Sequence, residues 1–135
     1  MLTTIDPKAA ALAVGPNGLE ETGILFRVTS MLEEWYNSHG QPAGGLKRFL
    51  EGRLGLSYEM ISHLLIVEEL KTLEQVDMEY RINLAKEWLV YGCFPPEEIA
   101  SRLQFRDLKE MESRFRLLTG LEVRYFLLLG EKRKH

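Results

Sequence analysis

The sequence lacks the features that most readily assign a chemistry to a protein. Its 135 residues contain one cysteine, Cys93, which excludes a disulfide framework and a paired-cysteine metal site. The three histidines, His39, His63 and His135, do not have the spacing of metal ligands. There is no Gly-rich phosphate loop, no catalytic-triad spacing and no pair of inward carboxylates. We therefore expect neither an enzyme nor a bound cofactor.

Targeting signals and long apolar runs are also missing. The first residues, MLTTIDPKAA, hold an acid and a proline where a signal peptide would have a basic stretch and an apolar run. No window of the sequence has the length and apolarity of a membrane span. Together with the single cysteine, these absences predict a soluble, cytoplasmic protein without a membrane partner.

The chain has no excess of positive charge. Lys and Arg total 17 and Asp and Glu total 20, which gives a formal charge of −3 and a pI near 5.7. Residues 1–45 hold 2 basic and 5 acidic side chains, so residues 46–135 hold 15 of each sign. A domain that binds nucleic acid is usually basic, so a neutral domain gains little from counterion release.

The sequence does contain an internal repeat: one short helical pattern occurs twice between residues 46 and 126. The first copy has Leu50, Leu54, Ser57, Ile61 and Leu65, and the second has Ile99, Leu103, Asp107, Met111 and Phe115. The offset is 49 residues for the first helix of each copy and 50 for the second, so the second turn is one residue longer. A short helix, a tight turn and a capped second helix form a helix-turn-helix unit.

Start and stop signals predict the helices around these turns. Thr72 with Gln75, and Asp107 with Glu110, have the spacing of capping boxes, and Pro96 suits the first position of a helix. The expected helices cover residues 7–14, 19–36, 46–54, 58–69, 73–91 and 121–132, with two more that begin at residues 96 and 108. The expected fold is all-α: two helix-turn-helix units joined by a long central helix, with an extra N-terminal helix.

Apolar spacing predicts which sides of two of these helices are buried. The long helix at residues 73–91 should bury Leu73, Val76, Tyr80, Leu84, Trp88 and Tyr91. The helix after Asp107 should bury Leu108, Met111, Phe115 and Leu118. Because apolar residues occur on more than one side of the long helix, we expect it to lie between two three-helix clusters.

Four segments also carry a family resemblance: SYEMISHLL, TLEQVDMEYRINLAKEWLVYG, EEIASRLQF and FRLLTGLEVRYF. They resemble the C-terminal DNA-binding domain of the AraC/XylS transcription regulators over residues 46–130, without gaps. The resemblance implies seven helices, two of which enter successive major-groove faces of one DNA site. It divides the chain into residues 1–45, an N-terminal extension with one amphipathic helix, and residues 46–135, an AraC-like double helix-turn-helix domain.

The sequence departs from the family pattern at several positions. The turn glycine of the second unit is replaced by Gln104, whereas the first unit keeps Gly55. A non-glycine residue in a left-handed turn costs up to about 1 kcal/mol, which a domain can tolerate. The Thr-Pro that starts the family's last helix is replaced by Glu122-Val123. In the first unit, Leu65-Ile66 stands where the family has Phe-Lys, which removes a cation and makes that unit degenerate.

The second helix of the second unit offers most of the expected DNA contacts. Its outward and flanking positions carry Arg106, Lys109, Ser113, Arg114 and Arg116. Arginine and lysine reach guanine edges or phosphates, so these residues are predicted to bind double-stranded DNA. Acids on the same helix offset the cations, and a solvated surface with ion pairs such as Glu110–Arg114 is an equal alternative.

The corresponding helix of the first unit is a poorer DNA surface. Its predicted contacts are Tyr58, Ser62 and His63, which supply little counter-charge. Met60, Ile66 and Val67 stand on the same outward side. These three residues form either an apolar patch for a protein partner or, if the helix is rotated, part of the core. The sequence thus leaves two functions open: a DNA-binding regulator, or an interaction module on a helix-turn-helix scaffold that has lost most DNA affinity.

Overall fold

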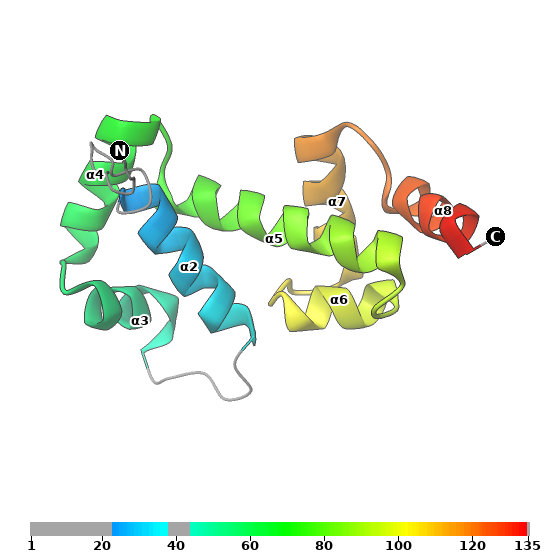
Figure 1. Cartoon of the computed structure of the whole chain (residues 1–135), viewed down its shortest axis with the longest axis horizontal. Coiled ribbons are helices and arrows are strands. Elements are labelled where there is room, and N and C mark those ends of the chain that lie inside the picture. The colour runs from blue at the N-terminus through cyan, green and yellow to red at the C-terminus, as the bar shows by residue number, and fades with distance from the viewer. Residues whose placement is uncertain (1–22, 38–43, 135) are drawn as a thin grey trace, which may run out of the picture. The chain divides into compact units, whose positions relative to one another are not determined.

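The structure, a computed structural model, describes residues 23–37 and 44–134, without the side chains of residues 133 and 134. These residues form the helices α2 (Ile24–Asn37), α3 (Gly45–Leu54), α4 (Tyr58–Glu69), α5 (Leu73–Tyr91), α6 (Pro96–Arg102), α7 (Leu108–Thr119) and α8 (Val123–Lys134). No strand occurs within this described part, and Figure 1 shows helices joined by turns. The predicted all-α fold is confirmed. The short helix expected at residues 7–14 lies outside the described residues.

The chain divides into two compact units, Met1–Val76 and Asp77–His135. The boundary falls within α5, which begins in the first unit and continues into the second. The prediction of a single unbroken helix over Leu73–Tyr91 is therefore confirmed.

None of the helices in the described part of the chain is long and apolar enough to cross a membrane.

The first unit is built on the packing of α2 against both α3 and α4. Its buried side chains come from all three helices and include Val28, Leu32, Leu50, Ile61 and Leu65. The ring centroids of Trp35 on α2 and Phe49 on α3 lie 5.3 Å apart. On the outside of the same helix pair, the carboxylate of Glu34 accepts hydrogen bonds from the guanidinium of Arg53. α2 is therefore part of the hydrophobic core around the first turn.

The second unit has its own core, formed by the later part of α5 and by α6, α7 and α8. Its buried side chains include Ile82, Ala85, Leu89, Ile99, Leu103, Met111, Phe115 and Val123. The backbone of α8 comes very close to the end of α5 at Gly130, where an added Cβ would lie 2.6 Å from the carbonyl oxygen of Val90. Only glycine fits this approach, so α8 is seated on α5 through a backbone contact.

The buried side of α5 differs from the expected stripe. Leu73 and Val76 are buried as predicted, but Tyr91 is 61% exposed, and the residues that α5 buries within the second unit are Ile82, Ala85 and Leu89. Tyr80, Leu84 and Trp88 are half-buried. Ile82 stands six residues after Val76, which is about two-thirds of a turn away from it around the helix. The predicted stripe is therefore correct at the start of α5 and wrong at Tyr91, because α5 buries a different side within each unit.

Most helix ends follow the signals in the sequence. The Thr72–Gln75 capping box is present, since each residue's backbone N–H donates to the other's side-chain oxygen, at 2.8 and 3.1 Å. Pro96 occupies the first turn of α6, and Gly120 ends α7 with φ of 75°. α8 begins two residues later than expected, at Val123. The expected burial of Leu118 is wrong, because its side chain is 44% exposed.

Candidate nucleic-acid interface

The two helix-turn-helix units share the geometry of their turns. Gly55 ends α3 with φ of 68° and ψ of 25°, in the left-handed region. Gln104, 49 residues later, has φ of 63° in the turn that follows α6. Both backbones therefore use the same left-handed step to redirect the chain toward the second helix of the unit. The expectation that Gln104 replaces a turn glycine in a left-handed conformation is confirmed.

Each turn leads into a second helix with a side-chain N-cap. The hydroxyl of Ser57 accepts a hydrogen bond of 3.1 Å from the backbone N–H of Met60 at the start of α4. The carboxylate of Asp107 accepts one of 2.8 Å from the backbone N–H of Glu110 at the start of α7. The carboxylate of Glu110 in turn accepts a 2.7 Å bond from the backbone N–H of Arg106, one residue before the cap. These bonds satisfy N–H groups that a helix start otherwise leaves free.

The outward side of α7 and Arg106, just before its N-cap, carry the predicted DNA contacts of the second unit. Arg106, Lys109, Ser113, Arg114 and Arg116 are all exposed. They stand on sides of the helix away from Met111 and Phe115, which are fully buried. No hydrogen bond or ion pair joins Glu110 to Arg114 in the described residues, because Glu110 is engaged at the N-terminal cap. The expected Glu110–Arg114 pair is therefore absent from this part of the structure.

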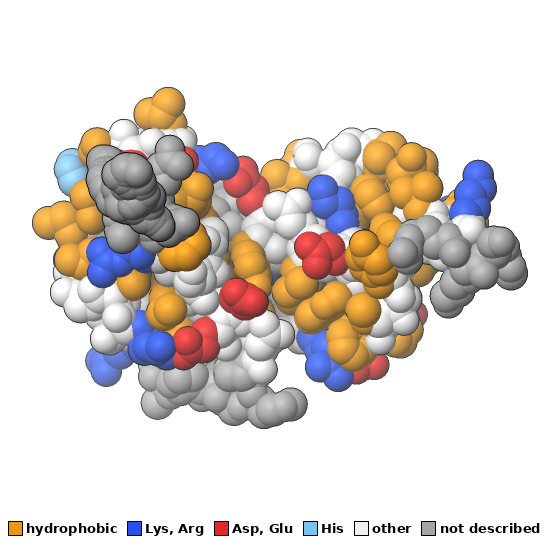
Figure 2. Space-filling view, viewed as in Figure 1, with side chains coloured by type: hydrophobic (Ala, Val, Ile, Leu, Met, Phe, Trp, Pro, Cys, Tyr) orange, Lys and Arg blue, Asp and Glu red, His pale blue; other side chains and the backbone are white. Residues whose placement is uncertain are grey.

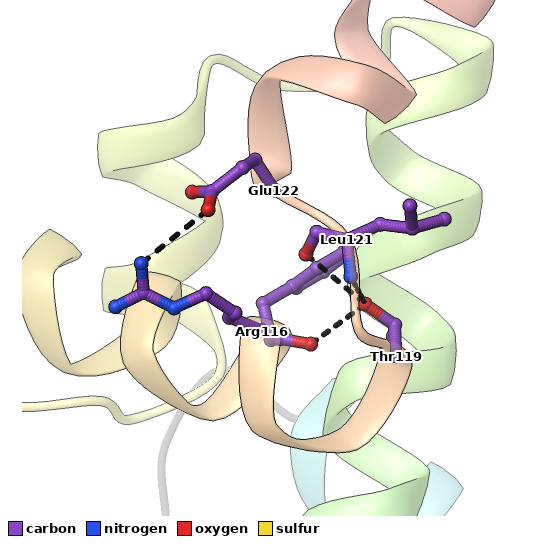
Figure 3. A network of polar contacts seen from close by, with 5 residues as sticks. Arg116, Thr119, Leu121 and Glu122 are labelled. Carbon is purple, nitrogen blue, oxygen red and sulfur yellow. Dashed lines mark hydrogen bonds and ion pairs between the residues drawn. The ribbon is translucent and has the colours of Figure 1, made fainter.

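Two of these five residues, Arg106 and Arg116, lie near carboxylates, but the distances are long enough to leave both guanidinium groups available to another anion. The Nε of Arg106 lies 3.9 Å from the carboxylate of Asp107, and both side chains are more than half exposed. The Nη1 of Arg116 lies 3.4 Å from the carboxylate of Glu122. Figure 3 shows the two side chains pointing toward each other. Exposed pairs of this kind contribute between roughly 0 and 1 kcal/mol, so a phosphate can displace the carboxylate.

The hydroxyl of Thr119 fixes the end of α7. The Thr119 hydroxyl donates to the carbonyl oxygen of Phe115 at 2.7 Å and accepts from the backbone N–H of Leu121 at 3.0 Å (Figure 3). A side chain that bridges the last turn of α7 and the start of the next connection fixes the direction in which the chain leaves the helix. It therefore also holds Arg116 and Glu122 near each other.

Arg81 positions the turn of the second unit, a role that the spacing of residues did not reveal. Its Nη1 donates to the carbonyl oxygen of Leu103 at 3.1 Å, and its Nη2 lies 3.1 Å from the carboxylate of Asp77. Its guanidinium carbon lies 4.7 Å from the centre of the Phe105 ring. Arg81 thus ties α5 to both residues that flank Gln104. The contact with Leu103 spans 22 residues of sequence, beyond the reach of any helical periodicity.

The predicted contacts of the first unit are less available. The hydroxyl of Tyr58 donates to the carboxylate of Glu74 at 2.5 Å, and the Nζ of Lys47 lies 4.4 Å from the centre of its ring. The bond to Glu74 is the main reason that the pKa of Tyr58 is raised above 10.0, and it also lowers the pKa of Glu74. Ser62 is half-buried and His63 is exposed. A phosphate at Tyr58 would therefore have to replace a carboxylate.

The outward side of α4 is acidic and apolar. The exposed fractions of Met60, Ile66 and Val67 are 46%, 49% and 62%, and Leu70 at the end of the helix is 85% exposed. In Figure 2, hydrophobic side chains and the histidine appear over the α4 side of the first unit. The alternative that a rotated helix buries these residues is wrong, because Ile61 and Leu65 form the buried side.

Three cations of the first unit lie on α3, a helix to which the sequence assigned no DNA contact. Lys47, Arg48 and Arg53 are exposed on this helix. In helix-turn-helix proteins, the first helix of the unit crosses the DNA backbone while the second enters the groove. The basic composition of α3 was the signal that could have suggested these residues.

No protein-family model matches the sequence. No curated protein matches it either. The fold is similar to that of a solved structure from Escherichia coli K-12, which is described as a DNA-binding transcriptional dual regulator. The likeness has a TM-score of 0.67 and covers 82% of this chain and 94% of that chain, with 15% sequence identity. The chain therefore shares the helical fold of that regulator.

Proposed function

We propose that this protein is a sequence-specific regulator that binds double-stranded DNA, of a type that resembles the AraC/XylS family. The observation that carries the proposal is the duplicated turn: Gly55 and Gln104 share a left-handed backbone, and each precedes a capped helix. A second helix presented in this way is the element that helix-turn-helix proteins insert into the major groove. α4 and α7 would then be the two recognition helices, in successive faces of the groove.

The two units would contribute unequally to this binding. The second unit presents four exposed cations, three on α7 and Arg106 just before its N-cap, and Lys109 and Arg114 have no ion-pair partner in the described part of the chain. α4 has three carboxylates and no lysine or arginine, so it repels phosphates. In the first unit, phosphate contacts would come instead from Lys47 and Arg48 of α3. We expect base reading mainly by α7, with modest overall affinity because residues 46–135 are neutral.

Selection from a random duplex library tests the proposal without knowledge of the natural site. The full chain should enrich a defined DNA motif, and its strongest positions should depend on Arg106 and Lys109. Two recognition helices in successive major-groove faces require half-sites about one helical turn apart, roughly 34 Å. If no motif is enriched, and anisotropy titrations at low salt detect no binding to random duplex, the protein is not a DNA-binding regulator.

The second candidate function is an interaction module on a helix-turn-helix scaffold. It is favoured by the exposure of Met60, Ile66 and Val67 beside Leu70, since adjoining exposed apolar side chains often mark a protein contact. Under this hypothesis α4 binds a protein in place of DNA. Replacing Ile66 and Val67 with serine would then remove the partner and leave any DNA affinity of α7 unchanged.

A further inference from the structure

The C-terminal helix α8 is apolar on two opposite sides. Val123 and Gly130 are buried against the rest of the second unit, and Phe126 and Leu127 beside them are half-buried. On the opposite side, Tyr125 is 46% exposed and Leu128 is 52% exposed. A surface helix normally has one apolar side, so a second one indicates a surface that another molecule covers.

The exposed side of α8 continues onto the end of α7. Leu121 precedes Tyr125 by four residues and is 40% exposed, and Leu129 is 37% exposed. Leu117 and Leu118, at the end of α7, are 77% and 44% exposed. In Figure 2, hydrophobic side chains gather over the end of α7 and its connection to α8. We call five of these residues the α8 stripe: Leu118, Leu121, Tyr125, Leu128 and Leu129.

One flank of the stripe carries a charged residue near each end of α8. Arg124 and Glu131 are both exposed, and neither has an ion-pair partner among the described residues. They are seven residues apart, so they lie on the same side of the helix to within about 20°. The start of this flank is therefore positive and its end is negative.

From these observations we propose that the α8 stripe binds the α8 stripe of a second copy of this chain, with the two helices antiparallel. In an antiparallel pair related by a two-fold axis, the same flank of each helix faces its counterpart in reverse order. Arg124 of each copy then meets Glu131 of the other, which gives two equal ion pairs around an apolar seam. A parallel pair would place Arg124 near Arg124 and Glu131 near Glu131 instead. An isologous two-fold contact of this kind is the commonest way in which proteins form dimers.

The centre of the seam falls between Tyr125 and Leu128. The midpoint of Arg124 and Glu131 lies between residues 127 and 128, so Leu128 stands next to the two-fold axis and Tyr125 packs beside it from each copy. The inner side of α8 is already held against α5 at Gly130, so pairing requires no rearrangement of the unit. The contact does not depend on DNA binding.

Charge reversal at the flank tests the antiparallel pairing directly. The measurement is the dimerisation constant of the full chain by sedimentation over a wide concentration range, without DNA. Arg124→Glu places two carboxylates at each end of the seam, and Glu131→Arg places two guanidinium groups there. Each single variant should weaken the dimer by about tenfold or more, because both symmetric pairs become repulsive.

The decisive sample is an equimolar mixture of the two single variants. In an antiparallel α8 pair each variant supplies the charge that the other has lost, so the mixture should form a mixed dimer of near wild-type strength. In a parallel pair the single reversals would change the dimer little, and the mixture would bind more tightly than the wild type. The double variant Arg124→Glu/Glu131→Arg should also dimerise normally. Leu128→Arg should abolish dimerisation, whereas Leu70→Arg, which changes the exposed leucine that follows α4, should leave it unchanged. Circular dichroism melts establish that each variant is folded.

The result that would overturn the proposal is equally specific. If the wild-type chain is monomeric at every concentration, or if Leu128→Arg dimerises as tightly as the wild type, α8 does not join two copies. If the single reversals weaken the dimer but their mixture does not restore it, the pairing is not antiparallel. A protein that does not bind DNA would still show the wild-type dimer, the effect of Leu128→Arg and the recovery in the mixture of single variants. This proposal and the proposed function can therefore fail separately.

Discussion

Gly55 and Gln104 occupy equivalent positions in the two helix-turn-helix turns, with φ of 68° and 63°. Glycine adopts this left-handed conformation freely, so Gly55 fits its turn at no cost. Gln104 has a Cβ, which disfavours the same conformation. An added Cβ at Gly55 would meet no atom within 4 Å, so the cost at this position is backbone strain and not a clash. The same strain is therefore expected at Gln104.

Relieving this strain should stabilise the second unit. We predict that Gln104→Gly raises the free energy of unfolding by about 1 kcal/mol relative to Gln104→Ala. The alanine variant is the matched control, because it removes the interactions of the glutamine side chain and keeps the strained Cβ. Urea denaturation of both variants measures the difference. Equal stabilities would mean that the left-handed turn carries no measurable strain.

Arg81 should be more important for stability than its position on a mostly half-buried helix suggests. Its side chain and that of Asp77 are 15% and 13% exposed, and it also holds the carbonyl oxygen of Leu103. Arg81→Leu leaves Asp77 without its cation and Leu103 without this donor, so we predict a loss of about 2–4 kcal/mol in unfolding free energy. The double variant Asp77→Asn/Arg81→Leu should recover part of that loss. A change below about 0.5 kcal/mol would show that Arg81 does not hold the turn.

The Tyr58–Glu74 hydrogen bond should make stability depend on pH at both extremes. Glu74 has a lowered pKa, so its stabilising contribution is present above its unfolded value of 4.5 and is lost as the pH falls through the lower folded pKa. Tyr58 has a raised pKa, so its contribution is present below 10.0 and is lost as the pH rises through the folded pKa.

The comparison of wild type with Tyr58→Phe isolates this contribution. The difference in unfolding free energy between the two proteins should be largest between these pH values and should shrink on either side. Chemical denaturation at a series of pH values gives the profile. A difference that stays constant across the whole range would mean that the hydroxyl and the carboxylate do not interact.

Glu59 should limit the contribution of the first unit to DNA binding. It is exposed in the first turn of α4, on the side that would face the groove. Glu59→Lys removes a repulsion and adds a counter-charge, so we predict DNA binding about threefold to tenfold tighter at low salt. Glu68→Lys is the matched control, because it makes the same change in net charge on a different side of α4. If both variants tighten binding equally, the effect is one of net charge and α4 is not at the groove.

The sequence predicted the local features of the fold well. Ser57, Thr72 and Asp107 cap the helices that they were expected to cap, because a cap depends on residues two or three positions away. Gly120 ends α7 for the same local reason. The sequence did not predict which side of α5 is buried, because that depends on what each unit places around the helix. It also missed Arg81 as the support of the second turn, since its partner Leu103 is 22 residues away.

The candidate site was predictable to a similar extent. Helical spacing placed Lys109 and Arg114 on the exposed side of α7, where the structure has them. It could not show that Tyr58 is engaged by Glu74, because the two residues are on different helices 16 positions apart. The assignment of DNA contacts to the outward residues of α4 and α7 stays a prediction.

The measurement that tests the central claim most directly is the salt dependence of DNA binding by wild type and by the triple variant Lys109→Ala/Arg114→Ala/Arg116→Ala. Each phosphate contact contributes roughly 0.9 to the slope of log affinity against log salt, so the triple variant should lower the slope by up to about 2.7. The control triple variant Arg27→Ala/Lys86→Ala/Lys132→Ala has the same net charge and should keep nearly the wild-type slope. If the two triple variants have equal slopes, α7 does not contact DNA and the proposed function is wrong.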